Sequence, residues 1–158
     1  MPSFRLAFIA LLASVLLAAP AVAAGNDPAL GTWVLNLSKS RFDPGPPPKS
    51  LMVRFQSDPK GVKNTTELVD ADGKASTIVY TAAYDGKEYP VTGSASVDTV
   101  LLRKHDNGKV ERVDRKGGVV VQSFLRSISE DGRTMTVTHK AKGANGALQH
   151  NRLVFDRR

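Results

Sequence analysis

The chain has 158 residues, which is the size of one globular domain, and it contains no cysteine. Disulfide bonds and a lipid anchor attached through a cysteine are therefore excluded. The formal net charge is +7, but the lysines and arginines are scattered and form no tract of five or more. This distribution is typical of a solvated surface, and we expect no nucleic-acid partner.

The first 24 residues differ in composition from the rest of the chain. Arg5 precedes an almost unbroken apolar run over residues 6–19, and small residues follow at 21–24. These are the three parts of a secretory signal peptide. We predict a cleaved signal peptide at residues 1–24, a single domain at 25–158 without a membrane span, and a periplasmic or secreted location. An uncleaved N-terminal anchor is the alternative, although the apolar run is shorter than the ~20 residues that a bilayer requires.

Turn signals recur at hairpin spacing through the rest of the chain. Asp-Gly, Asn-Gly and Gly-Gly pairs provide the positive φ angles that short hairpin turns need. They occur at residues 72–73, 85–86, 107–108, 117–118, 131–132 and 145–146. The runs between them are rich in Val, Thr, Ile and Leu, which favour strands. We predict strands at 31–37, 51–57, 62–69, 75–84, 97–105, 109–116, 119–129, 134–141 and 148–156, with a further short strand at 87–92 as an open alternative.

The side chains in these runs alternate between two faces. Leu51, Val53 and Phe55 share one face of a predicted strand, and Met135, Val137 and His139 share one face of another. No window of helical length shows a 3.6-residue apolar period. Short turns pair strands that are neighbours in sequence, and closing a meander of about 8–10 strands removes its two exposed edges. The sequence therefore predicts an all-β, antiparallel up-and-down closed β-barrel, with a proline-rich loop at residues 38–49 after the first strand.

Several segments carry a family resemblance. Gly31-Thr32-Trp33 opens the first predicted strand, the last strand ends at residues 154–157, and two characteristic runs occupy 80–93 and 131–138. Together they resemble the calycins, the superfamily of lipocalins and fatty-acid-binding proteins, and in particular the exported lipocalin-like proteins of bacteria. The resemblance implies that Trp33 plugs one end of the barrel. It also implies that a basic side chain near the end of the last strand lies across the indole, with Arg157 as the first candidate and Arg158 or Arg152 as alternatives.

The chain also departs from the family pattern. A proline-rich loop occupies the place of the helix-turn-helix lid of fatty-acid-binding proteins. Their Arg-x-Tyr pair for a ligand carboxylate has no tyrosine here, since the matching run is Arg152-Leu153-Val154-Phe155. The family's usual route of carboxylate recognition is thus in question. The resemblance implies a carrier of a small hydrophobic or amphipathic ligand. The alternative is a ligand-free structural or protein-interaction module of the cell envelope, with a filled barrel interior.

The candidate ligand-binding residues combine aromatic and basic side chains. They are Tyr80, Tyr84, Arg103, Arg112 and Arg126. If they face the barrel interior, they suit an amphipathic anion, because aromatic rings can contact its body and a guanidinium its head group. In the alternative interpretation, the tyrosines pack in the core or at the rim and the arginines point to water.

No catalytic pattern accompanies these residues. There is no Gly-x-Ser-x-Gly motif and no cysteine nucleophile. The three histidines, His105, His139 and His150, lie singly on separate predicted strands, so we expect surface or rim positions and no metal site. Asp114 and Glu111 lie in a charged strand and are expected to be solvated. We therefore expect neither an enzyme nor a bound cofactor.

Overall fold

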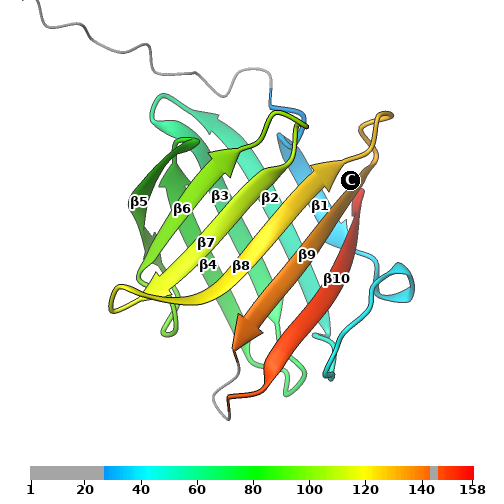
Figure 1. The fold of residues 1–158 in the computed structure, drawn as a ribbon. Helices are drawn as coiled ribbons and strands as arrows, with labels where there is room; N and C mark the ends of the chain where they lie inside the picture. The colour runs from blue at the N-terminus through cyan, green and yellow to red at the C-terminus, as the bar shows by residue number, and fades with distance from the viewer. Residues whose placement is uncertain (1–26, 143–145) are drawn as a thin grey trace, which may run out of the picture.

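A computed structural model describes residues 27–142 and 146–158, and within these residues the chain forms a closed antiparallel β-barrel (Figure 1). The predicted signal peptide, residues 1–24, lies outside the described residues. The strands are β1 (Gly31–Leu35), β2 (Ser50–Asp58), β3 (Gly61–Val69), β4 (Ala75–Ala82), β5 (Asp85–Thr92), β6 (Thr99–Lys104), β7 (Val110–Lys116), β8 (Val119–Ile128), β9 (Thr134–Lys142) and β10 (Leu148–Arg157). One short 3-10 helix, η2 (Leu37–Lys39), follows β1. In the described part of the chain, no helix has the length and apolar content to cross a bilayer.

Each strand pairs with the next one along the chain, and β1 pairs with β10 to close the barrel. Trp33 lies opposite Arg157 and Leu35 opposite Phe155 across this last junction. The predicted up-and-down meander and its closure are therefore confirmed. All ten strands are antiparallel, in agreement with the all-β fold class.

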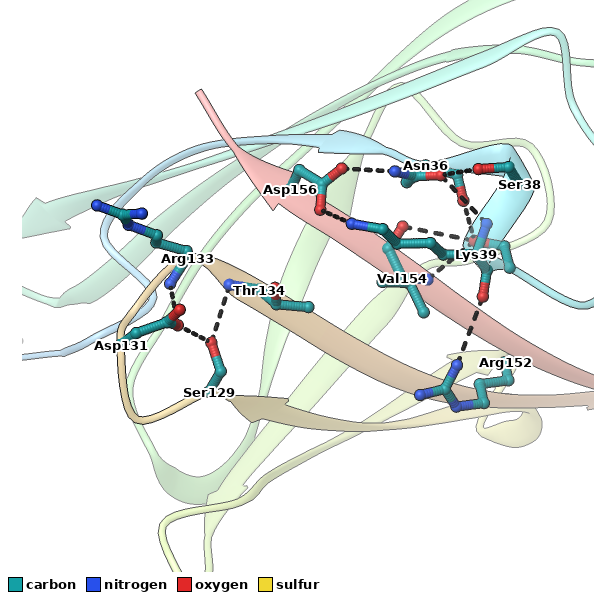
Figure 2. A network of polar contacts seen from close by, with 11 residues as sticks. Asn36, Ser38, Lys39, Ser129, Asp131, Arg133, Thr134, Arg152, Val154 and Asp156 are labelled. Atoms are coloured by element: carbon teal, nitrogen blue, oxygen red, sulfur yellow. Dashed lines mark hydrogen bonds and ion pairs between the residues drawn. The ribbon is translucent and has the colours of Figure 1, made fainter.

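The junction of β1 and β10 is short, and the segment that follows β1 reinforces it (Figure 2). Asn36 Nδ2 donates to Asp156 Oδ2 at 2.6 Å, and Lys39 Nζ lies 3.0 Å from Asp156 Oδ1. The amide of Val154 donates to Ser40 Oγ at 2.9 Å. These bonds hold η2 on the outer side of β10, so the closing strand is bonded to the chain beyond the end of β1.

The strand predicted at 75–84 is shorter in the structure, and the open alternative at 87–92 is a full strand. β4 ends at Ala82, and β5 begins at Asp85, so the Asp85–Gly86 pair lies inside a strand and is not a hairpin turn. Close approach of backbones explains a glycine at the other end of β5. A Cβ on Gly93, whose φ is +79°, would lie 1.8 Å from the carbonyl oxygen of Thr77 in β4. Only glycine permits this crossing.

The core lies inside the barrel, because alternate residues of every strand point inward. Trp33 and Met135 are almost completely buried, and the inward residues of β2 and β10 pack around them. Leu51, Val53 and Phe55 face the interior together, as predicted, and so do Met135 and Val137 of β9. The inward side chains fill the end of the barrel near Trp33, which we call the bottom, and leave space towards the opposite end.

Candidate ligand-binding cavity

The space inside the barrel is a cavity of about 550 Å³. Its wall is mainly apolar and includes Leu51, Val53, Phe55, Leu68, Ile78 and Val137. All of these are inward positions of strands, so the period-two alternation of the sequence builds the wall directly. Cavities that hold small ligands have volumes of roughly 300–1,000 Å³, and this one lies within that range.

The proline-rich segment forms part of the rim at one end of the cavity. Phe42, Pro44 and Pro46 line the cavity there. The backbone of Asp43 anchors the segment to β10. Its carbonyl accepts from the amide of His150 at 2.7 Å, and its amide donates to Asn151 Oδ1 at 2.9 Å. The loop predicted between the first two strands is therefore attached along the last strand and borders the cavity.

The opposite end is closed by an indole and a guanidinium. Trp33 is fully buried, and its Nε1 donates to the carbonyl of Ala29 at 2.7 Å. The guanidinium carbon of Arg157 lies 4.3 Å from the centre of the indole ring. Arg157 also donates to three backbone carbonyls, those of Leu30, Pro28 and Gly132, at 2.5–2.7 Å. Arg157 thus joins the N-terminal segment, the β8–β9 turn and β10 across the closed end.

A second guanidinium lies at the bottom of the cavity. Arg126 is buried, its Nη2 lies 3.4 Å from Asp27 Oδ2, and the same nitrogen donates to the hydroxyl of Tyr84 at 3.1 Å. Tyr84 donates in turn to Asp27. Burial raises the pKa of Tyr84 above its usual value, so the phenol is neutral. The guanidinium carbon of Arg126 also lies 4.6 Å from the ring centre of Phe55.

A row of polar side chains crosses one wall of the cavity. We call Arg112, Asp114, Gln122, His139 and Asn151 the polar row. Arg112 binds Asp114 through two hydrogen bonds, Nε to Oδ1 at 2.6 Å and Nη2 to Oδ2 at 2.7 Å. Asp114 is fully buried and also accepts from Gln122 Nε2 at 2.7 Å. The guanidinium of Arg112 lies between the rings of Tyr80 and Phe124, 4.8 and 4.9 Å from their centres.

The hydrogen bonds of the polar row converge on Asp114, from Arg112 on one side and from Asn151 through His139 and Gln122 on the other. Because Gln122 donates its amide nitrogen to Asp114, its Oε1 faces His139 Nε2 at 3.2 Å, and this contact assigns the proton to Nε2. His139 Nδ1 then accepts from Asn151 Nδ2 at 3.1 Å. The imidazole stacks on Phe124 with a centroid distance of 4.5 Å. Burial lowers the pKa of His139 to about 4, so the ring is neutral at neutral pH.

The structure brings together most, but not all, of the predicted ligand-binding residues. Tyr80, Arg112 and Arg126 line the cavity, and Tyr84 lies beneath it against Arg126. Arg103 does not belong to the site. It follows the inward residue Leu102 on β6, so alternation turns it outward, where it is exposed.

Two further expectations require correction. Asp114 is not solvated but fully buried, because it lies two residues from Arg112 on the inward face of β7 and pairs with it. Glu111, with the opposite phase, lies outside the cavity lining. His139, expected at the surface or the rim, is half-buried and lines the cavity, whereas His150 is exposed, as expected. Among residues 27–142 and 146–158, no group of three or more His, Asp or Glu side chains is placed to hold a metal ion.

Sequence signals for the missed residues were present but incomplete. The phase of Met135 and Val137 places His139 on the buried face, and the phase of Arg112 does the same for Asp114. Gln122 shares the phase of Arg126, and Asn151 that of Leu153, but their hydrogen-bond partners lie on neighbouring strands, and Asp27, which precedes the first strand, carried no signal. Neither a family model nor a curated protein matches this chain. The closed antiparallel barrel is consistent with a calycin-like fold.

Proposed function

We propose that this protein is an exported calycin-like carrier that binds one small hydrophobic or amphipathic molecule inside the barrel. The single observation that supports the proposal is the cavity of about 550 Å³, with an apolar wall and one polar row. The other parts of the proposal are a periplasmic or secreted location, inferred from the signal-peptide pattern, and binding without chemical conversion of the ligand. Trp33 and Arg157 would act as a structural closure and would not contact the ligand.

The cavity favours this function over a ligand-free envelope module. That alternative depends on a filled interior, in which Phe, Leu and Met side chains meet across the barrel. Here the large inward residues Trp33 and Met135 pack towards the closed end, and a cavity of about 550 Å³ remains between the other inward side chains. An empty apolar cavity loses dispersion contacts that a ligand would restore.

The apolar wall sets an expected dependence of affinity on ligand size. Each buried CH₂ group contributes about 0.8 kcal/mol, so the affinity for a homologous series should rise roughly fourfold per methylene until the cavity is full. The rise should stop at a chain length that the cavity volume determines.

A matched pair of tryptophan variants tests whether binding occurs in the cavity. Thr66 and Thr65 are neighbours on β3, both half-buried, but only Thr66 lines the cavity. Titration with Nile red, an uncharged fluorescent dye, should show one saturable site per wild-type chain. Thr66→Trp should weaken binding at least tenfold, and Thr65→Trp should leave it within threefold, with folding of both checked by circular dichroism. Equal affinity in both variants, or no saturable site in the wild type, would contradict the proposal.

A further inference from the structure

The charges around the cavity are balanced pair by pair. The guanidinium of Arg112 is engaged by the carboxylate of Asp114 in a two-bond ion pair at 2.6 Å. The guanidinium of Arg126 is paired with Asp27 at 3.4 Å and bonded to a neutral phenol. Among the cavity-lining side chains of the described residues, these two arginines are the only cations. Neither of them is left without a carboxylate.

The rest of the polar row contributes no charge. His139 donates from Nε2 and accepts at Nδ1, which is the pattern of a neutral imidazole. A protonated ring would direct a second N–H at the amide nitrogen of Asn151, which is itself a donor. Burial favours the neutral form as well. The polar row thus offers donors and acceptors, but no free positive charge.

The charged side chains that line the mouth of the cavity are carboxylates. Asp70 and Asp72, in the β3–β4 turn, line the mouth of the cavity, and no lysine lies among the lining residues of the described chain. The net charge of +7 can attract anions to the surface as a whole. Inside, however, a carboxylate would have to compete with Asp114 for Arg112 and would lie close to a like charge.

We propose that the ligand is an uncharged amphipathic molecule, with an apolar chain or ring system and one neutral hydrogen-bonding oxygen placed against the polar row. A hydroxyl or an ester carbonyl fits this description, and a fatty-acid carboxylate does not. An ion-paired guanidinium can still donate to a neutral oxygen, because Arg112 has five N–H groups and Asp114 engages two of them. The apolar body then lies against the opposite wall, near Leu68 and Ile78. This inference rests on the proposed carrier function and narrows its ligand class.

Competition by a matched alcohol and acid tests the inference on the wild-type protein. 1-Decanol and decanoate have the same chain length, and decanoate is ionised at mildly alkaline pH. Each is titrated against bound Nile red. We expect decanol to displace the dye with at least tenfold higher affinity than decanoate. Equal or tighter binding of decanoate would overturn the inference while leaving the carrier function intact. Failure of Nile red itself to bind would overturn both.

A charge variant tests the cause of the selectivity. Asp114→Asn keeps the shape of the side chain but leaves Arg112 without its carboxylate. Decanoate should then bind at least tenfold more tightly than to the wild type, and this gain should clearly exceed any change in the affinity for decanol. Asp156→Asn is the matched control, because this carboxylate is also ion-paired but lies on the outer side of β10. Unchanged decanoate binding by a folded Asp114→Asn variant, or an equal gain in the control, would overturn the explanation. The wild-type comparison decides the ligand class even if Asp114→Asn does not fold.

Discussion

Replacing His139 with glutamine should change how the stability of the protein depends on pH. The imidazole lines the cavity, stacks on Phe124 and is bonded as a neutral ring to Gln122 and Asn151. Burial lowers its pKa from 6.5 to about 4. The charge of Asp114 raises this pKa and the charge of Arg112 lowers it, and both effects are smaller than that of burial. Glutamine retains an amide that can donate and accept in the same row, but it does not titrate.

The size of this pH effect follows from the difference between the pKa of His139 in the folded state and its pKa in the unfolded state. An unfolded histidine takes up a proton near pH 6.5, whereas folded His139 does so only near pH 4. The unfolded state therefore binds more protons between these values, and the stability falls as the pH drops through this window. Above pH 6.5 the full stability is present, and below about pH 4 no more is lost on account of this residue. At roughly 1.4 kcal/mol per pH unit, the total loss is about 3 kcal/mol.

Urea unfolding at about pH 7 and about pH 4.5 measures this loss as a difference between two proteins. The wild type should lose about 2–3 kcal/mol more free energy of unfolding than His139→Gln over this interval. Carboxylates such as Asp156 and Asp131, whose pKa values lie below the usual value, also reduce stability in acid. They are present in both proteins, so their effect cancels in the comparison. Parallel pH profiles within roughly 0.5 kcal/mol would refute the assignment of His139 as a buried neutral ring.

Two further predictions concern the frame of the barrel. Gly93→Ala should destabilise the protein by clearly more than the roughly 1–2 kcal/mol expected for a left-handed φ alone, because its Cβ would clash with the Thr77 carbonyl. Gly108→Ala, at a φ of +75° with nothing nearby, should show only the backbone cost, and equal losses in urea unfolding would contradict the close-packing argument. Arg157→Lys should lower the free energy of unfolding by about 1–2 kcal/mol, because an ammonium cannot bond three carbonyls and cover the indole. The control is Arg158→Lys, and a loss as large in the control as in Arg157→Lys would argue against a specific closure.

Much of the fold could be predicted from local sequence features. Turn pairs fixed most strand ends, and alternation such as that of Leu51, Val53 and Phe55 identified the inward faces. The start of β5 was not predicted, because Asp85-Gly86 is a strong turn signal in isolation. In the barrel, the backbone turns at Ala83 and Tyr84 instead, and Asp85 pairs with Arg103 of β6.

The site was predictable only in part, for a physical reason. The sequence indicated that aromatic and basic side chains would gather, and Tyr80, Arg112 and Arg126 do line the cavity. A buried carboxylate such as Asp114 is stable only with a partner, and part of its stabilisation comes from Gln122 on the neighbouring strand. That contact depends on the register of β7 and β8, which local patterns leave open.

Under the proposed function, one small uncharged molecule occupies the barrel interior. The most direct measurement is methyl NMR during a titration with 1-decanol. We predict shifts of the methyl resonances of Val137 and Ile78, which line the cavity, and none for Leu125 and Leu148, which are exposed on the outside. Shifts confined to the outer methyl groups, or no shifts at saturating decanol, would contradict binding inside the barrel.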